Sequence, residues 1–319
     1  MIVLYVIIFI VSCILLFLSS KLVIKSLLRI ARFLGWKEFV VAFLVMSFAA
    51  SLPNLFVGIF SALHKIPQLS FGDIVGGNVV DLTLAIALAV LFTRGGIVAE
   101  SRTVQKTSIF TLIAAILPLI LILDGNFSRI DGILSIAFFF FYLFWLFSKK
   151  ERFVDIYNSY KIPILKGLKI FLRDLGGLML GIILLLVAAE EIVRSAQFFA
   201  GKFNLPVSLI GILVIGLGNA LPETYLAISA AKRGEGWMIL GDLMGSVIVP
   251  ATLVIGIVAL ICPIKIIDFS PFAIARIFLV ISALFFFFFV RTGRKITKKE
   301  AWFLLSIYIL FVLAEILTR

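Results

Sequence analysis

The sequence predicts an all-α membrane protein whose ten transmembrane helices form two inverted repeats of five helices each. Three observations carry this prediction: an apolar composition, ten long apolar runs and an internal repeat at a fixed spacing. Of the 319 residues, 63% are hydrophobic and 14% are charged, against about 45–50% and about 25% in soluble domains. A soluble fold of this length could not hide so much apolar surface, whereas a lipid bilayer accommodates it.

Charge and motif content exclude several classes of protein. The formal net charge is +12, and the chain has one histidine and two cysteines. Its lysines and arginines cluster between the apolar runs, which is typical of membrane-protein loops and requires no nucleic-acid partner. No HExxH, GxSxG or Walker-type motif occurs, which argues against an intramembrane metalloprotease and an ATP-driven pump. We therefore expect no enzyme activity, no resident cofactor and no nucleic-acid partner.

Ten runs of about 20 apolar residues, bounded by charge, glycine or proline, are long enough to span a bilayer. The first has neither a basic segment before it nor a small-residue cleavage site, so we expect an uncleaved span and not a secretory signal. The ten expected spans are residues 2–28, 38–62, 71–93, 105–123, 130–148, 173–200, 206–231, 237–262, 271–291 and 300–317.

The loops between these spans differ strongly in charge. One set of alternate loops holds 20 lysines and arginines, and the opposite set holds 5. Because basic loops stay in the cytoplasm, both termini are expected outside and the basic 149–172 loop inside. This loop lies near the chain midpoint and separates a first five-helix unit, residues 1–148, from a second, residues 173–319.

The two halves of the sequence align with each other without a gap between Lys21 and Leu84 of the first half. This alignment, which places position 53 on position 222, is called the repeat register below. Each half holds five spans, an odd number, so the halves enter the membrane in opposite directions. Such inverted repeats are typical of secondary transporters, with the substrate site at the midplane between the halves. The matching pairs are Leu52-Pro53 with Leu221-Pro222, Gly72-Asp73-x-x-Gly76 with Gly241-Asp242-x-x-Gly245, and Thr83-Leu84 with Thr252-Leu253.

The second span of each half carries a proline near its centre, Pro53 and Pro222. A proline removes a helical hydrogen bond, and in lipid such helix breaks persist where they line a protein cavity or bind ions. Two breaks at equivalent positions favour a site over a simple kink. Glu223 lies deep in its span, where a carboxylate costs roughly 2.5–3.5 kcal/mol; a cation site or a protonated or arginine-paired glutamate would offset that cost. The polar neighbours of the prolines are Ser51, Asn54, Asn219 and Glu223.

The third span of each half supplies a second polar wall. Asp73 and Asp81 lie along one helix face, since their spacing is close to two helical turns. Asp73 and Asp242 begin their spans, so a helix N-cap is an alternative for both, whereas Asp81 lies too deep to cap a helix. Hard cations take carboxylate, amide, hydroxyl and carbonyl oxygens, which is the donor set that these spans offer: Asp73, Asn78, Asp81, Asp242 and Ser246.

Further charges lie in the first and sixth spans. The repeat register places Lys21 on Glu190 and Lys25 on Arg194. Glu190 and Arg194 stand one helical turn apart and could pair. We therefore expect these charges to form structural pairs or to extend toward the membrane surface.

The paired segments resemble the alpha-repeats of the calcium/cation antiporter superfamily, in particular the sodium/calcium exchanger group. The family pattern is similar to Gly/Ala-Thr/Asn-Ser/Ala-Leu-Pro-Glu in one span and Gly-Asn/Asp-x-x-Gly-Ser-Asn in the next, in both halves. The first copy here reads Ala49-Ala50-Ser51-Leu52-Pro53-Asn54 and Gly72-Asp73-Ile74-Val75-Gly76-Gly77-Asn78. The second reads Gly218-Asn219-Ala220-Leu221-Pro222-Glu223 and Gly241-Asp242-Leu243-Met244-Gly245-Ser246-Val247.

In that family, two motif glutamates straddle a central calcium ion, and nearby hydroxyls, carbonyls and a carboxylate or amide take sodium. The resemblance implies that Glu223 is one of the two glutamates, while Asn54 stands at the position of the other. Where the family places asparagine or aspartate a turn further along the third span, this chain has Asp81 and Pro250. One carboxylate is thus lost at position 54, and Asp81 supplies one from the opposite wall.

We therefore expect a secondary active cation antiporter, foremost of the sodium/calcium type, that works by alternating access at a midplane site with Glu223 and Asp81 as the metal ligands. The transported cations would be calcium, sodium or protons. The alternatives are a proton-coupled or other-metal cation exchanger and a non-transporting family member with a structural or regulatory role. The expected location is the plasma membrane, with cations and the lipid bilayer as partners, and no sequence feature indicates an oligomeric state.

Overall fold

The computed structural model describes residues 1–33, 46–148 and 164–317. Its first half contains the helices α1 (Ile2–Phe33), α2 (Ser47–Ala50), α3 (Leu52–Leu63), α4 (Gln68–Val80), α5 (Ile86–Phe92), α6 (Arg102–Leu121) and α7 (Arg129–Phe147). The second half contains α8 (Ile164–Phe203), α9 (Val207–Ile210), α10 (Gly216–Arg233), α11 (Gly236–Val249), α12 (Ile255–Ile261), α13 (Ser270–Arg291) and α14 (Lys298–Leu317).

Nine helical segments of the described chain are long and apolar enough to cross a membrane, and a shorter apolar segment covers Ser47–Leu63. This arrangement confirms the predicted fold class, an integral multi-pass membrane protein. Part of the expected second span, residues 38–45, lies outside the described residues. The helix α8 begins at Ile164, inside the segment assigned to the 149–172 loop. The stretch from Ile164 to Phe203 contains no proline, so nothing in it breaks the helix.

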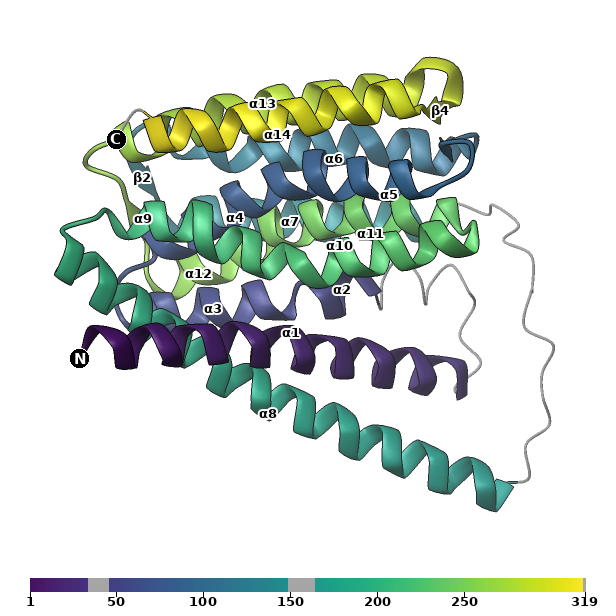
Figure 1. Ribbon diagram of the computed structural model, residues 1–319, viewed down its shortest axis with the longest axis horizontal. Helices are drawn as coiled ribbons and strands as arrows, with labels where there is room; N and C mark the ends of the chain where they lie inside the picture. The colour runs from purple at the N-terminus through teal and green to yellow at the C-terminus, as the bar shows by residue number, and fades with distance from the viewer. Residues whose placement is uncertain (34–45, 149–163, 318–319) are drawn as a thin grey trace.

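The two halves run in opposite directions. In Figure 1, α1 and its repeat counterpart α8 lie side by side and are antiparallel. Two short strand pairs lie at the two ends of the molecule. Each pair joins one strand from the first half with one from the second. The pairs are β1 (Ile97–Val98) with β4 (Lys295–Ile296), and β2 (Asn126–Phe127) with β3 (Ile264–Lys265).

Two contacts between α1 and α8 lie at equivalent positions of the internal repeat. Arg29 pairs with Asp174 at 3.0 Å near one end of the two helices, and Tyr5 stacks on Phe198 with ring centroids 3.8 Å apart near the other. In the repeat register Tyr5 falls on Asp174, and Arg29 falls on Phe198. The pair α1–α8 is therefore held at both ends by interactions at equivalent positions, although the chemistry of the two contacts differs.

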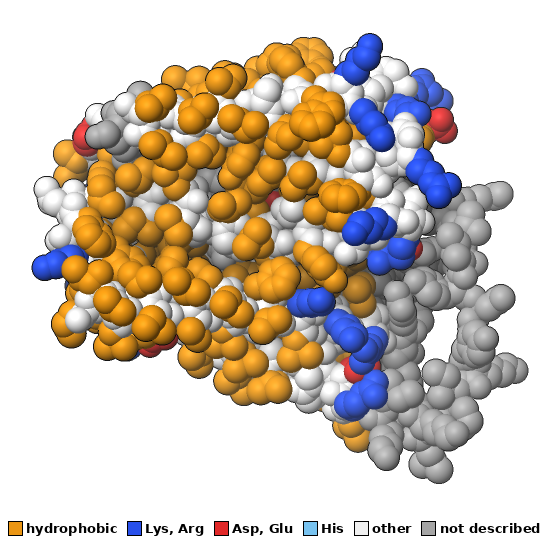
Figure 2. Space-filling model, in the orientation of Figure 1, with side chains coloured by type: hydrophobic (Ala, Val, Ile, Leu, Met, Phe, Trp, Pro, Cys, Tyr) orange, Lys and Arg blue, Asp and Glu red, His pale blue; other side chains and the backbone are white. Residues whose placement is uncertain are grey.

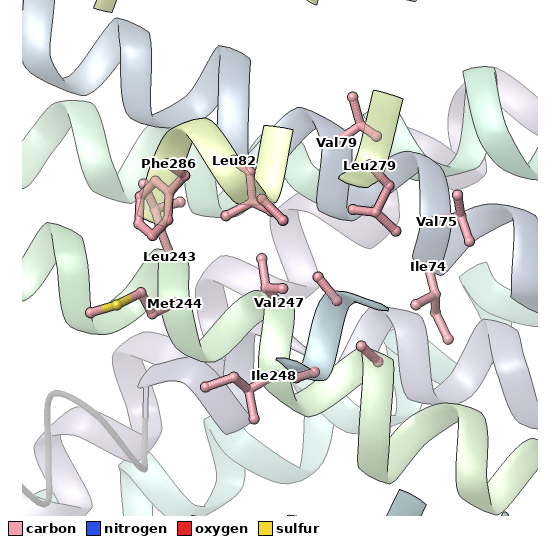
Figure 3. Close-up of a cluster of buried hydrophobic side chains, with 14 of the residues drawn as sticks. Ile74, Val75, Val79, Leu82, Leu243, Met244, Val247, Ile248, Leu279 and Phe286 are labelled. Carbon is pink, nitrogen blue, oxygen red and sulfur yellow. The ribbon is translucent and has the colours of Figure 1, made fainter. Parts of the chain in front are cut away.

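The third spans occupy the centre of the molecule. Within their apolar windows, 83% of Gln68–Phe92 and 78% of Met238–Ile261 is buried, against 17% for the first span. The apolar face of the first one meets α13 and that of the second meets α6; Figure 3 shows Val79 and Leu82 of the first beside Leu279 and Phe286 of α13, and Val247 of the second in the same cluster. Each third span contains a π-helical turn at an equivalent position, Asp81–Ala85 and Pro250–Val254, and such turns are frequent at functional sites.

A second hydrophobic cluster packs α1 and α8 against α3 and the segment α9–α10, apart from the main core. Figure 2 shows a largely hydrophobic surface along the helices, as expected for contact with lipid, and basic side chains at the end where β4 lies. The exposed basic residues at that end include Arg94, Arg102, Arg291, Arg294 and Lys295. This end is called the basic end below.

Glycines bring α4 into backbone contact with α9–α10. A Cβ atom at Gly76 would lie 2.1 Å from the carbonyl oxygen of Ile212, and one at Gly72 would lie 2.4 Å from that of Ser208. A Cβ at Gly216 would lie 2.7 Å from the backbone nitrogen of Gly77. No other residue permits so close an approach, so these glycines set the distance between the polar faces of the two helices.

Candidate cation-binding site

The two prolines have different local effects. The helix is interrupted at Ser51, between α2 and α3, and Pro53 occupies the first turn of α3, where a missing N–H costs little. The predicted break at Pro222 is wrong, because α10 continues through this residue. Pro222 still leaves the carbonyl of Gly218 without its helical donor, and a separate π-helical turn at Gly211–Ile215 precedes α10.

Asp73 and Asn219 form a buried clamp between α4 and α10. The Asn219 side-chain amide donates to both carboxylate oxygens of Asp73 at 2.9 Å. The N-cap alternative fails for both aspartates, because Pro67 and Glu235 occupy the cap positions and Asp73 and Asp242 lie inside their helices. Both oxygens of Asp73 already accept hydrogen bonds. Among the candidate carboxylates, Asp73 is therefore the one with both oxygens hydrogen-bonded to another side chain.

Asp81 and Ser246 connect the two third spans. The Ser246 hydroxyl donates to Oδ2 of Asp81 at 2.8 Å, across 165 residues of sequence. Both side chains are buried, and Oδ1 of Asp81 has no hydrogen-bond partner among the described residues. Asp81 begins the first π-helical turn and Pro250 begins the second, so only one of the two turns offers a carboxylate.

Glu223 lies on α10 with 3% of its surface exposed, and its Oε2 has no hydrogen-bond partner in the part of the chain that the structure describes. It lies within electrostatic reach of Asp81, Asp242 and Asp73. Arg194 does not neutralise it, because that guanidinium pairs with Glu190 at 2.6 Å. The structure therefore brings four predicted acidic residues into one buried electrostatic cluster.

The remaining predicted residues are buried on α3 and α4, two helices that pack against each other, and at the interruption before α3. Asn54 on α3 and Asn78 on α4 are buried, and Nδ2 of Asn78 is unpaired among the residues described. The Ser51 hydroxyl donates to the Ser47 carbonyl at 2.8 Å, across the helix interruption. These buried amide and hydroxyl groups, with the carboxylates, are of the types that hard cations use as ligands.

Ser47 is a residue that the sequence reasoning missed. Its hydroxyl donates to the carbonyl of Gly241 at 3.4 Å, and a Cβ at Gly245 would lie 2.0 Å from its Oγ. The repeat register pairs Ser47 with Gly216, which makes the equivalent close contact with α4. That correspondence was the signal that could have identified it.

The charges of the first and sixth spans lie outside this cluster. Glu190 pairs with Arg194 as expected, and it also lies 3.0 Å from Nε2 of His64, the residue that follows α3. Lys21 donates to the hydroxyl of Tyr225 at 3.3 Å. Within the described ranges, no three histidine, cysteine, aspartate or glutamate side chains are close enough to hold one metal ion. Any bound cation must therefore also use the amide, hydroxyl and backbone oxygens.

An inverted-repeat helical membrane fold with a buried, mixed oxygen donor cluster where the halves meet defines a secondary transporter of cations. The family model for the sodium/calcium exchanger protein matches residues 4–148 and 174–317. The chain belongs to this family.

Individual relatives agree with this assignment over nearly the whole chain. An uncharacterised membrane protein of Methanocaldococcus jannaschii is 27% identical over 95% of both chains. The sodium/calcium exchanger MaX1 of Methanosarcina acetivorans is 24% identical over 92% of this chain and 93% of its own length. The solved structure of the sodium-calcium exchanger NCX_Mj, soaked with sodium and strontium, superposes with a TM-score of 0.68 at 26% identity and covers 98% of this chain and 99% of that one.

Proposed function

We propose that this protein is a cation antiporter of the sodium/calcium type, which exchanges ions by alternating access at a site centred on Glu223 and Asp81. The observation that carries the proposal is the pair of unpaired buried oxygens, Oε2 of Glu223 and Oδ1 of Asp81. A buried carboxylate oxygen without a donor is costly, and a cation shared by the two carboxylates offsets that cost. Two ionised carboxylates match the charge of one divalent ion.

The site differs from a symmetric pair of glutamates. Asn54 offers an amide where Glu223 offers a carboxylate, and Asp81 supplies the second negative charge from the third span of the first half. Ser246 holds one Asp81 oxygen toward the second half of the chain, which leaves the other oxygen available. Asn54, Asn78 and Ser51 complete the proposed central ligand set. Asp73 and Asn219 hold α4 against α10, and Asp242 lies beside the central site.

Membrane orientation follows from the charge distribution. The basic end of the molecule carries the loops that the sequence assigns to the cytoplasm, so we place this end inside, both termini outside and the protein in the plasma membrane. The two units, residues 1–148 and 173–319, then form the two inverted halves that enclose the site, with residues 149–172 on the cytoplasmic side.

Exchange is tested with purified protein in proteoliposomes. Sodium-loaded vesicles diluted into sodium-free buffer with radioactive calcium should accumulate calcium only when the gradient is present. Glu223→Gln keeps the shape and one oxygen but removes the charge, and it should lower uptake at least tenfold. Glu191→Gln, a carboxylate on α8 outside the cluster, is the matched control and should transport like the wild type. Wild-type uptake by Glu223→Gln would contradict the central site.

The same vesicles separate the alternative driving ions. Uptake driven by a pH gradient in the absence of sodium would identify a proton-coupled exchanger, and uptake of another divalent metal in preference to calcium would identify the other-metal alternative. Calcium uptake without any counter-ion gradient, rising linearly with calcium concentration, would instead indicate a channel.

A further inference from the structure

At two places in the described chain, side chains form hydrogen bonds between the helix pair α1–α8 and the rest of the fold. Lys21 of α1 donates to the Tyr225 hydroxyl of α10 at 3.3 Å. Nε2 of His64, the residue that follows α3, lies 3.0 and 3.1 Å from the two carboxylate oxygens of Glu190 on α8. Lys21 and Glu190 occupy equivalent positions in the repeat register, so each half supplies one such contact.

The two contacts lie toward opposite ends of the molecule. His64 stands in the short turn between α3 and α4, and Gln68 at the start of α4 donates to the carbonyl of Lys265 on β3 at 2.9 Å. The pair β2–β3 lies at the end opposite the basic end (Figure 1). The helix α1 starts at that same end, and Lys21 follows about 29 Å along its axis. The His64 contact is therefore remote from the basic end, and the Lys21 contact lies toward it.

Glu190 is shared between α8 itself and the turn after α3. Nε of Arg194, one turn further along α8, lies 2.6 Å from the same Oε1 that faces His64. An ionised carboxylate only accepts hydrogen bonds, so Nε2 of His64 must carry a hydrogen in this contact. A neutral imidazole meets this requirement in one of its two tautomers, and the imidazolium meets it with a full positive charge.

The charges on α8 favour a positive His64. Arg194 also lies 3.7 Å from Glu191, so two carboxylates share one guanidinium and leave one negative charge uncompensated. A proton on His64 brings this group of four side chains to neutrality. The His64 side chain is 30% exposed and that of Glu190 is 20% exposed, so water and protons reach the contact.

Other ionisable groups of the neighbouring elements do not replace His64 in this role. Histidine is the residue type that ordinarily changes its charge near neutral pH, and the chain has one. Lys65 and Lys265, on the adjoining turn and strand, are exposed, so water and salt screen their charge. The helix α12 has no charged residue, and α1 has no charged side chain before Lys21. The Tyr5 phenol of α1 acts on Arg194.

The pair α1–α8 packs apart from the main hydrophobic core. Its buried residues form a separate cluster with α3 and α9–α10, and the pair lies along one side of the molecule (Figure 1). The contacts Arg29–Asp174 and Tyr5–Phe198 hold its two helices together at both ends. Alternating access requires that one part of the fold moves relative to another, and this pair can move as a unit. Such a movement breaks or exchanges the contacts that tie it to the rest.

We infer that His64 and Glu190 form a proton-strengthened latch between α8 and the turn after α3, which slows exchange as the pH falls from about 8 to about 6. A charged His64 binds Glu190 more strongly than a neutral one, so by linkage the latched conformation binds the proton more tightly than the unlatched one. Acid therefore favours the latched conformation. The contact of Lys21 with Tyr225 lacks this response, because amines and phenols ordinarily keep their charge in this range. The inference rests on the proposed function, since it presupposes the movement that transport requires.

Thermal unfolding of the purified full-length protein in detergent tests the latch without transport. The wild type, His64→Gln, Glu190→Gln and the double variant are compared at pH 6 and at pH 8. Glutamine at position 64 keeps a hydrogen-bond donor but cannot gain a charge. The loss of unfolding temperature in His64→Gln should be larger at pH 6 than at pH 8 by about 2 °C, and this difference should vanish in the Glu190→Gln background.

Exchange in proteoliposomes with equal pH on both sides tests the effect on transport, because no proton gradient then drives it. Initial rates over a range of calcium concentrations separate the maximal rate, which the latch lowers, from the half-saturating concentration, which proton competition at the central site raises. Between pH 8 and pH 6, the maximal rate of the wild type should fall about two- to fivefold more than that of His64→Gln, the range that a partly exposed ion pair supplies.

Two further variants sharpen this assay. Lys202→Gln, exposed near the end of α8 that is remote from the basic end, is the matched control for a change of charge, and it should follow the wild type. His64→Arg places a permanent charge opposite Glu190, and its maximal rate should be low at both pH values.

Three outcomes overturn the inference. The first is a loss of unfolding temperature in His64→Gln that is equal at pH 6 and pH 8. The second is a maximal rate of His64→Gln that falls with pH as steeply as that of the wild type. The third is a folded His64→Arg protein that exchanges as fast at pH 6 as the wild type does at pH 8. Wild-type protein that exchanges no cations at either pH would instead refute the proposed function, and the unfolding comparison would still decide whether the latch exists.

Discussion

Replacing Gly76 by alanine tests whether backbone contact between α4 and α9–α10 sets the geometry of the site. The added Cβ would lie 2.1 Å from the carbonyl oxygen of Ile212 and 2.7 Å from its Cα. Ordinary contact begins near 3.4 Å, so the two backbones must separate by more than an ångström. No side-chain rotation relieves this clash, because the atoms that it meets belong to the main chain.

The cost follows from two terms. Overpacking of a tight core costs about 1–3 kcal/mol, and a clash with backbone belongs at the upper end, about 3 kcal/mol. The same separation would lengthen the 2.9 Å hydrogen bonds from Asn219 to Asp73 to about 4 Å, beyond hydrogen-bond range. Leaving a buried carboxylate without its donor adds about 1–3 kcal/mol. We therefore expect Gly76→Ala to destabilise the protein by about 4–6 kcal/mol and to abolish exchange.

Thermal unfolding in detergent, followed by size-exclusion chromatography of heated samples, measures this loss. Gly176→Ala in α8 is the matched control, because nothing lies within 4 Å of its added Cβ; its unfolding temperature should stay the same or rise, since alanine favours a helix by up to about 1 kcal/mol. Gly245→Ala should also lower the unfolding temperature, because its Cβ would lie 2.4 Å from Cβ of Ser47, an atom that side-chain rotation does not move. A wild-type unfolding temperature in Gly76→Ala would refute the backbone-contact argument.

Other contacts predict further outcomes. Asn219→Ala should lower stability by about 1–3 kcal/mol by orphaning the Asp73 carboxylate, and a double-mutant cycle with Asp73→Ala should recover most of that coupling; additive losses would contradict the clamp. Arg29→Ala should cost about 1–2 kcal/mol, because Asp174 is buried while the arginine is partly exposed, and Arg29→Lys should restore part of it. For topology, a C-terminal reporter that is active only in the cytoplasm should stay silent, and strong activity would reverse the proposed orientation.

The sequence by itself determined the class of fold, because the forces that set it are local or compositional. An apolar run of about 20 residues spans a bilayer whatever it packs against, so the described spans lie close to those expected. The internal repeat specified the inverted halves, and the two π-helical turns at Asp81–Ala85 and Pro250–Val254 follow its register. The pairing of Glu190 with Arg194 was also predictable, because a fixed helical spacing brings them together.

Only the tertiary structure decided which polar side chains meet. The repeat predicted the same role for Asp73 and Asp242. Packing gave them different surroundings, because the Asn219 amide donates to Asp73, whereas Ala50, at the equivalent position, has no donor for Asp242. The bond from Ser246 to Asp81 joins residues on different helices, and no spacing along the chain encodes it. The continuity of α10 through Pro222 was equally unforeseen. Such contacts depend on the rotation and separation of neighbouring helices. Between α4 and α9–α10, the close approach of Gly72, Gly76 and Gly216 sets that separation.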